Sequence, residues 1–317
     1  MKTPSSLPIH EVFTVAQAFE RKLVTVAAVQ IANRLGLNVP YEWWSSSSLL
    51  KSFEAAGFGW TQIPAPPEAV LADPSECRAH SRAVATALAN TGLQSVIHGP
   101  GSMVAGSAGA DRIFEGLLDY AAEAGARQVI YHARNCPDSP GSEDRLLAET
   151  RSLARLAARA ESLGISIALE NLAPLFAGPE RLGHTPRVLR TLAQRISSPA
   201  VGLCIDVGHA YIAADLRHAD VVDLVGPALD AAICFHAHDN FGARRSHATR
   251  PELDPMRLDL HLPPGRGDLP WDRLSPLIAE HDAPVLLEIH PPHRPDPSVL
   301  HEQTIDVMGA RATQLAA

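Results

Sequence analysis

Residues 204–212 read CIDVGHAYI, and this stretch decides the fold. An apolar run, VGLCI (201–205), continues directly into Asp206, and Gly208 and His209 follow. A buried carboxylate is costly unless something pairs with it. The run therefore ends either at the surface or beside a positive charge. The residues that end the other apolar runs show which of these two possibilities is the better one.

Eight short apolar runs alternate with amphipathic stretches along the chain. They predict strands at LNVPYEW (37–43), WTQIPAP (60–66), QSVIHGP (94–100), RQVIYHAR (127–134), ISIALENL (165–172), VGLCIDVG (201–208), AAICFHAHDN (231–240) and APVLLEIHP (283–291). Helical patterns fill the intervals, and several begin at Ser, Thr or Asp and end at Gly, as helices prefer. Short apolar strands of this kind, without clear alternation, are typical of parallel strands covered by helices.

This order predicts an α/β protein with a single (β/α)8 TIM barrel over residues 37–317. A doubly wound open sheet is the alternative, but the GxGxxG turn expected after its first strand is missing. Residues 1–36 include the amphipathic pattern FTVAQAFERKLVTVAAVQIANRLG. We expect an extra N-terminal helix there, which packs on the barrel or on a partner subunit.

The composition narrows the class of protein. The 317 residues are 46% hydrophobic and 20% charged, which suits a globular chain with a sizeable core. A net charge of −8 argues against a general affinity for nucleic acid. Four widely spaced cysteines (Cys77, Cys136, Cys204 and Cys234) are typical of buried thiols in a reducing compartment. The polar opening of the chain and the lack of an apolar run of about 18 residues predict a cytoplasmic protein without a membrane span.

Side chains that can bind metals stand at the ends of six consecutive predicted strands. They are His98, His132, Glu170, Asp206, His236 and Glu288. The carboxyl ends of the strands of a TIM barrel meet at one mouth, so these side chains converge. Mixed His, Asp and Glu ligation suits transition metals such as Zn²⁺ and Mn²⁺. The sequence therefore predicts a divalent cation beside Asp206.

More candidate ligands follow the sixth and seventh strands. His209 comes just after Asp206, and Gly208 lets the chain turn between them. The loop DLHLPPGRGDLPW (259–271) brings Asp259 and His261 over the rim. His238 also follows the seventh strand, but we expect alternation along the strand to turn it away from the site. Asn171 and Asn240 are expected to orient ligands, and the histidines expected at the surface are His184, His290, His293 and His301.

Each candidate also has a purely structural interpretation. Glu170, Asp206 and Glu288 could form ion pairs at the rim, and His98 and His132 could be hydrogen-bonded core histidines. Trp43, Trp44 and Trp60 are expected in the core, although one of them could wall a sugar pocket. Five arginines near the seventh loop either hold a phosphate or carboxylate of the substrate or lie solvated. They are Arg244, Arg245, Arg250, Arg257 and Arg266.

Seven motifs in order give the chain a family resemblance: VIHGP, VIYHAR, ALENL, CIDVGHA, FHAHDN, DLHLPPGRGDLPW and LLEIHP. Together they resemble the xylose isomerase-like TIM-barrel superfamily, the AP endonuclease family 2 group of sugar isomerases, epimerases and endonuclease IV. The resemblance runs from about residue 90 to 292, and more faintly from 48.

The resemblance implies a ligand set. Glu170, Asp206, His236 and Glu288 match the four metal ligands of the sugar epimerases. The additional positions of the multinuclear zinc site of endonuclease IV are matched by His98, His132, His209, Asp259 and His261.

The resemblance leaves three functions open. The first is a divalent-metal-dependent isomerase or epimerase of a sugar or related hydroxy-ketone. In it, Glu170 and Glu288 transfer protons through a metal-stabilised enediolate, and His209 binds a substrate hydroxyl or a second metal. The alternatives are an endonuclease IV-like multinuclear zinc phosphodiesterase and a metal-dependent dehydratase or lyase on the same barrel.

Local sequence favours the isomerase or epimerase. The run ENLAP stands where endonuclease IV has an ENTAG-like run, and DVGH stands in place of a DTCH-like motif. No basic, DNA-penetrating loop follows the early strands. We therefore expect Glu170, Glu288 and His209 to be catalytic, one to three Mn²⁺ or Zn²⁺ ions per chain, and a small sugar-like substrate without nucleic-acid or membrane partners. The N-terminal helix is compatible with a homo-oligomer.

Overall fold

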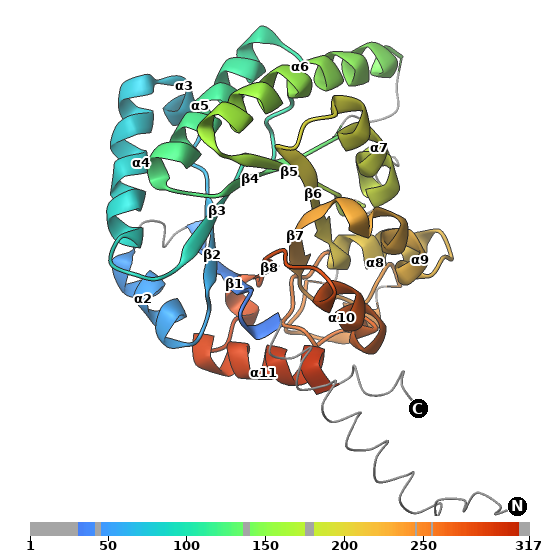
Figure 1. Ribbon diagram of the computed structural model, residues 1–317. Coiled ribbons are helices and arrows are strands. Elements are labelled where there is room, and N and C mark those ends of the chain that lie inside the picture. Colours follow the sequence, from blue (N-terminus) through green and yellow to red (C-terminus); the bar gives the residue numbers. More distant parts are fainter. Residues whose placement is uncertain are drawn as a thin grey trace, which may run out of the picture.

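The computed structural model describes residues 31–41, 46–135, 140–174, 181–244, 246–254 and 256–310. Eight parallel strands pair in chain order and close into a barrel. Helices form a ring outside the strands (Figure 1). The strands are β1 (Leu35–Asn38), β2 (Trp60–Pro64), β3 (Gln94–His98), β4 (Gln128–His132), β5 (Ser166–Glu170), β6 (Val201–Asp206), β7 (Ala232–Ala237) and β8 (Val285–Leu287). The predicted TIM barrel is confirmed, and the open-sheet alternative is wrong, because β1 pairs with β8.

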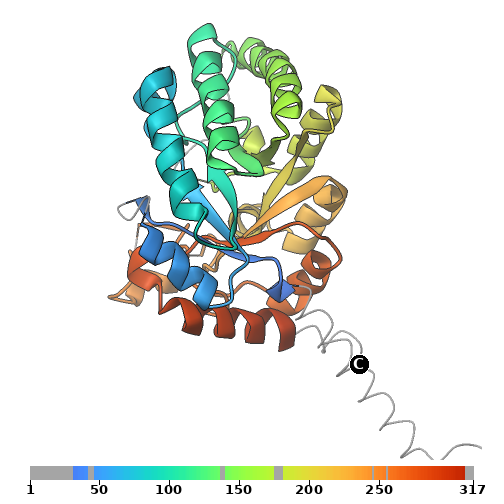
Figure 2. The same ribbon diagram turned by 60° about the vertical axis from the view of Figure 1, so that its left-hand side comes forward.

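The helices lie between consecutive strands and cover the outer face of the barrel (Figure 2). They are α2 (Ser47–Ala55), α3 (Glu68–Ala72), α4 (Pro74–Leu88), α5 (Ala108–Ala124), α6 (Ser142–Leu163), α7 (Pro186–Ile196), α8 (Val207–Leu216), α9 (Val221–Val225), α10 (Trp271–Ala279) and α11 (Pro297–Ala310). Within the described residues, the short 3-10 helices include η2 (Leu182–His184), η3 (Gly226–Ala231), η4 (Ser246–Thr249) and η5 (Pro291–His293). The last helix, α11, lies against α2 and so closes the outer ring.

The N-terminal part differs from its prediction. The strand predicted at 37–43 is β1, Leu35–Asn38, so it starts and ends earlier. The sequence pattern assigned Leu35 to the preceding helix, whereas in the structure it pairs with Val285. The predicted N-terminal helix lies almost wholly outside the described residues, because residues 1–30 are not among them. Trp43 and Trp44 also lie outside them.

The strands are apolar on both faces, which explains why no alternation is visible in the sequence. Their outward side chains pack on the helices as part of the main core, and Ile97, Leu169 and Phe235 are examples. Their inward side chains form a second apolar cluster inside the barrel. This cluster, which we call the barrel plug, consists of Val96, Ile130, Ala168, Cys204, Cys234 and Leu286. Trp60 and Ile233 pack against it.

Side chains two positions apart along a strand point to the same side. The residue two positions after each member of the barrel plug therefore also points inward, one layer nearer the mouth. Those six residues are His98, His132, Glu170, Asp206, His236 and Glu288. Asp206 therefore stands directly above Cys204 on the inner side of β6, and its carboxylate points into the barrel mouth.

The thiols fit the prediction of buried, unpaired cysteines. Cys77, Cys204 and Cys234 are all buried and free, and Cys136 lies outside the described residues. Within the described part of the chain, no helix combines the length and apolar character that crossing a membrane requires.

Candidate metal centre

Four candidate ligands form the centre of the site at the barrel mouth. Glu170, Asp206, His236 and Glu288, which we call the central donor group, each offer one ligand atom, and these atoms lie within 4.8 Å of one another. His236 Nδ1 lies 3.1 Å from Glu170 Oε1, 3.5 Å from Glu288 Oε2 and 3.6 Å from Asp206 Oδ2. All four side chains are buried. This brings together the four ligands that the family resemblance implied.

Two histidines lie on the β3 and β4 side of this group. His98 Nε2 is 3.3 Å and His132 Nε2 is 3.2 Å from Glu170 Oε2. We call His98, His132 and Glu170 the histidine donor group, and their ligand atoms also lie within 4.8 Å of one another. Glu170 belongs to both groups through its two oxygens, so its carboxylate lies where it can bridge two ions.

A third set of ligands lies beside β6 and β7. His209, His238, Asp259 and His261, which we call the outer donor group, again have ligand atoms within 4.8 Å of one another. Asp259 Oδ2 lies 2.8 Å from His261 Nε2 and 3.4 Å from His209 Nε2, and Asp259 Oδ1 lies 3.7 Å from His238 Nε2. Every residue predicted to bind metal thus lies in one of three adjoining groups.

The start of α8 places His209. Asp206 is the N-cap of α8, and its Oδ1 accepts a hydrogen bond from His209 N at 2.7 Å. His209 Nδ1 donates to Asn171 O at 2.8 Å, which leaves Nε2 facing Asp259. Asn171 also exchanges hydrogen bonds of 2.9 Å with the backbone of Asp206 in both directions. The predicted orienting role of Asn171 therefore has a specific structural basis.

Gly208 leaves room for an imidazole. A Cβ added at this position would lie 2.2 Å from Cε1 of His238 and 2.5 Å from its Nε2. Asn240 Nδ2 donates to Gly208 O at 3.0 Å and holds the turn in place. The glycine is thus required because His238 packs directly on its Cα. The turn that the sequence suggested is not the reason, because Gly208 lies in the first turn of α8 and has no positive φ.

The expected orientation of His238 is wrong. His238 Nε2 lies 3.1 Å from Asp206 Oδ1, so this imidazole faces the site. The reason is that residues two apart on a strand share a face, and His236 already points inward. Applying the same period to β2 would also have found Gln62, which the sequence analysis missed. Its Oε1 accepts from His236 Nε2 at 2.7 Å, and its amide donates to Glu288.

The predictions for His184 and for the arginines near the seventh loop can also be compared with the structure. His184 was expected at the surface but is buried, and its Nδ1 accepts from Arg181 N at 3.2 Å. Arg244 is bound to Asp215 at 3.0 Å. Arg250 lies 4.3 Å from the ring centre of Phe241. These two arginines are therefore already in contact with the protein itself, and Arg245 lies outside the described residues.

Burial and charge act in opposite directions on the carboxylates of the site. Burial alone would raise the pKa values of Glu170, Asp206, Asp259 and Glu288, but the surrounding imidazoles hold all four below their usual range. His236 and His132 act on Glu170 in this way, and His261 and His209 act on Asp259. The carboxylates are therefore ionised at neutral pH.

The same pairing raises the pKa of the imidazoles. Burial would lower it, but Asp206 and Asp259 hold the pKa of His209 well above 6.5. Glu288 and Glu170 do the same for His236, and Asp259 raises the pKa of His261 to about 9. Without a cation, protons on the imidazoles balance the carboxylates.

The residues fit a divalent transition metal. Glu170 Oε2 and Asp259 Oδ1 are buried acceptors that receive no hydrogen bond from any described residue. A buried acceptor of this kind is costly unless a cation or donor meets it. Imidazoles mixed with carboxylates are the ligands that Zn²⁺ and similar ions take. Cys204 and Cys234 also lie close to His236, but burial holds the pKa of Cys204 well above its usual value, which keeps this thiol protonated.

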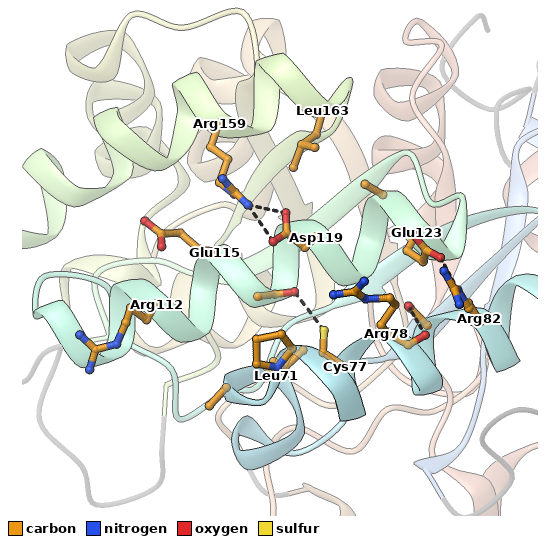
Figure 3. A pocket seen from close by; sticks show the side chains of 15 residues that line it. Leu71, Cys77, Arg78, Arg82, Arg112, Glu115, Asp119, Glu123, Arg159 and Leu163 are labelled. Atoms are coloured by element: carbon orange, nitrogen blue, oxygen red, sulfur yellow. Dashed lines mark hydrogen bonds and ion pairs between the residues drawn. The ribbon is translucent and has the colours of Figure 1, made fainter.

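A large groove on the outside of the barrel is a weaker candidate for a functional site. It has a volume of about 670 Å³ and is lined by α3, α4, α5 and α6 (Figure 3). Two of its arginines are neutralised within the groove, since Arg159 contacts Asp119 at 2.6 and 2.7 Å and Arg82 contacts Glu123 at 2.8 Å. These ion pairs connect neighbouring helices. They lie among helix side chains and not at the strand ends.

Comparisons with known proteins agree with this architecture. A family model described as "xylose isomerase-like TIM barrel" matches residues 50–310. The uncharacterized protein y4fM of Sinorhizobium fredii is 30% identical over 171 residues, which are 53% of this chain and 48% of that protein. The chain thus spans about half the length of this curated relative.

Two solved structures share the fold. A D-tagatose 3-epimerase-like protein is 19% identical with a TM-score of 0.64, and the match covers 88% of this chain and 99% of that one. An L-ribulose 3-epimerase is 16% identical with a TM-score of 0.61, and the match covers 89% and 95%. At these identities, the likeness establishes the fold.

Proposed function

The chain belongs to the family of xylose isomerase-like TIM barrels, and from this membership we propose that it is a divalent-metal-dependent isomerase or epimerase of a sugar or related hydroxy-ketone. The central donor group carries the proposal, because it gathers four buried ligand atoms from different strands within 4.8 Å. The proteins with the same fold include ones described as a D-tagatose 3-epimerase-like protein and an L-ribulose 3-epimerase, which supports a small sugar as substrate.

The central donor group would hold Mn²⁺ or Zn²⁺ through one atom of each residue. When bound, such an ion polarises the carbonyl and the neighbouring hydroxyl of a substrate and stabilises the negative charge of an enediolate. Gln62 accepts a hydrogen bond from His236 Nε2 at 2.7 Å, which leaves Nδ1 of that ring as the ligand atom. The proposed role of Gln62 is therefore to fix the tautomer and the orientation of His236.

Glu170 and Glu288 are assigned the proton transfers. They end β5 and follow β8, which are separated by two strands around the barrel. A carboxylate that would give one oxygen to the ion can use a lone pair of the other to take a proton from the carbon next to the carbonyl, or to return one. The Glu288 side chain is 10% exposed and that of Glu170 is 1% exposed, so the substrate would reach Glu288 more directly.

His209 is assigned a contact with a substrate hydroxyl. Its Nδ1 is engaged by the Asn171 carbonyl, so its Nε2 is the atom that faces the mouth and the Asp259 carboxylate. An imidazole held in this way donates to or accepts from one hydroxyl with a fixed orientation. The same atom would serve as a ligand if an ion occupied the outer donor group.

One observation favours a second candidate function. The histidine donor group and the outer donor group flank the central donor group, and Glu170 is shared between two of them. Room for two or three neighbouring ions suits hydrolysis of a phosphate ester, in which adjacent metal ions bind the attacking and leaving oxygens. The second candidate is therefore a multinuclear zinc phosphodiesterase, as the endonuclease IV resemblance suggested.

Substitution of the two glutamates tests the first candidate. Glu170→Gln and Glu288→Gln should each lower turnover of the active ketose by at least about 100-fold, because a positioned acid or base typically contributes that much. Exchange of the carbon-bound hydrogen in D₂O, followed by NMR, measures the proton transfer directly. Asp268→Asn, a change of an exposed carboxylate in the loop over the mouth, is the matched control. Full activity in both glutamine variants would make the acid–base assignment wrong.

Elemental analysis and a substrate panel separate the candidates. Activity on ketoses that is lost with a chelator and restored by one ion per chain is the expected result for the isomerase or epimerase. Three zinc ions per chain with cleavage of DNA that contains abasic sites would establish the phosphodiesterase. A dehydrated product from the ketose panel would indicate the lyase alternative.

A further inference from the structure

Asp239 follows β7 directly and is a fully buried carboxylate. Its two oxygens accept four N–H groups: Oδ1 from Asn240 N (3.0 Å) and Leu269 N (3.1 Å), and Oδ2 from Gly265 N (2.8 Å) and Trp271 Nε1 (2.9 Å). Three of these donors belong to residues 259–271, the segment that carries Asp259 and His261. We propose that Asp239 is a positioning residue that builds the outer donor group by fixing this loop over the barrel mouth.

The backbone of Asp239 clamps the loop beside a ligand. Asp239 N donates to Leu262 O at 2.7 Å, and Leu262 N donates to Asp239 O at 3.0 Å. These two bonds form an isolated antiparallel bridge, and Leu262 is the residue next to His261. The main chain of Asp239 thus holds the first part of the loop, while its carboxylate holds the later part up to the start of α10.

The clamp matters because His261 has an unfavourable backbone conformation. Its φ is 50°, in the left-handed region that residues other than glycine seldom adopt. Such a conformation persists only where the surrounding structure determines it, and it is common at functional sites. His261 Nδ1 donates to Glu288 O at 2.8 Å, which sets the ring so that Nε2 meets Asp259 Oδ2 at 2.8 Å.

The loop passes so close to Asp239 that one of its positions requires glycine. A Cβ added at Gly267 would lie 2.4 Å from Asp239 Oδ1 and 2.3 Å from Asn240 O. The next residue, Asp268, donates its N–H to Asn240 O at 2.9 Å. The contact between the loop and Asp239 is therefore a direct backbone-to-carboxylate packing without intervening side chains.

An amide cannot replace this carboxylate. Each oxygen of Asp239 receives two N–H groups, whereas an asparagine has only one oxygen and would turn its own NH₂ toward two donors. Two N–H donors, at least one of them from the loop, would then be buried without an acceptor. We therefore expect Asp239→Asn to release the loop locally and leave the central donor group, whose four ligands come from strands β5 to β8, in place.

The test rests on the proposed metal centre and uses zinc itself as the probe. Wild-type protein, Asp239→Asn and the control Asp268→Asn are loaded with zinc, and zinc is then removed by a graded chelator while content and affinity are followed. In wild type and the control we expect a tightly held central ion and a second ion in the outer donor group. In Asp239→Asn the outer affinity should fall at least about 10-fold, as for lost orienting partners of ligands, and the central affinity should stay.

Amide hydrogen exchange gives a readout that needs no metal. Gly265 and Leu269, whose N–H groups point at Asp239, should exchange faster in metal-free Asp239→Asn than in the control, while amides of β6 and β7 stay protected. Trp271→Phe, which removes one donor and keeps most of the volume, should give a smaller loss of outer zinc in the same direction. This variant also tests the proposal if Asp239→Asn does not fold.

Three results would overturn the proposal. One is wild-type outer zinc affinity in Asp239→Asn or, if that variant does not fold, in Trp271→Phe. Another is an equal loss of both ions together with general destabilisation, which would mean a purely structural role. The third is a wild-type protein that holds the central ion alone, which would leave the proposed isomerase intact while removing the outer site. Failure of wild type to hold any zinc or manganese would instead refute the proposed metal centre itself.

Discussion

Gln62 connects two ligands of the central donor group through one amide. Its oxygen accepts from His236 Nε2 and its nitrogen donates to Glu288, so it fixes which face of each ligand meets the ion. Loss of a partner that orients a metal ligand typically lowers metal affinity about 10–100-fold. The identity of residue 62 is therefore informative about the site even though it offers the ion no charge.

Replacement of Gln62 should weaken the central ion without unfolding the protein. We expect Gln62→Leu to lower zinc or manganese affinity by about 10–100-fold, because His236 loses the acceptor that fixes its tautomer. Competition with a chelator measures the change. Gln128→Leu is the matched control, since Gln128 stands at the opposite end of a strand and bonds to Ile233 O at 2.9 Å. Equal affinities in the two variants would contradict the orienting role.

The comparison of sequence and structure is most informative for single residues of the site. The convergence of the six candidate ligands at the strand ends was predictable, because a polar residue that ends an otherwise apolar strand is conspicuous. Gln62 was missed because a glutamine inside WTQIP looks like any polar strand residue. His238 and Gln62 both follow from counting two positions along a strand, which shows that the period carried more information than residue type.

At the level of elements, Asp111 ties α5 to α6. Its carboxylate accepts from Gly106 N at 2.9 Å, Ser152 Oγ at 2.7 Å and Arg155 NH2 at 2.8 Å. Burial would raise the pKa of Asp111, but these donors hold it below the usual value of 3.8. A depressed pKa in the folded state means that the stabilisation is present above the unfolded pKa and is lost as the pH falls through the folded one.

The pH dependence of this link is therefore predictable. Asp111→Asn should lower the free energy of unfolding by roughly 1–3 kcal/mol at pH 7, since a buried network loses charge-assisted bonds. The difference from wild type should persist to pH 5 and shrink below about pH 4 as Asp111 itself becomes protonated. Urea unfolding at several pH values measures it. Asp119→Asn, in an exposed ion pair with Arg159, serves as the control, and a difference that grows at low pH would contradict the assignment.

The element boundaries were predictable to different degrees. Seven of the predicted strands contain the observed strand within their bounds, because helix caps and glycines separate them from the helices. β1 was misplaced at both ends. Its strand consists of only LGLN, and the preceding helical pattern includes Leu35 and Gly36, while the predicted strand ran past Pro40 to residue 43. The pairing of these four residues depends on distant β8.

For the whole molecule, removal of the ion should make stability depend on pH in the alkaline range. In the metal-free protein, protonated imidazoles balance the carboxylates, and the pKa of His261 is raised to about 9. Groups with raised pKa values contribute fully below the unfolded value of about 6.5 and lose their contribution as the pH rises toward the folded value. For His261 alone, this loss amounts to roughly 3 kcal/mol between these limits.

Chelated protein should therefore become less stable from pH 6.5 to 9, while zinc-loaded protein should not. Urea denaturation of both forms at pH 6.5, 7.5 and 9 measures the gap, and proton release on zinc binding at pH 7 provides a second readout. The same measurement on protein without added zinc or chelator shows whether the purified protein behaves like the zinc-loaded or the chelated form. A gap that is independent of pH would mean that protons do not replace the ion at this centre.

The barrel plug also determines from which side small molecules reach the site. Val96, Ile130, Ala168, Cys204, Cys234 and Leu286 fill the barrel under the candidate ligands, so no molecule reaches the site along the barrel axis from below. A reactant and an exchanging ion would therefore arrive on the same side of the barrel from which a product departs. A slowly leaving product would then obstruct the following cycle directly.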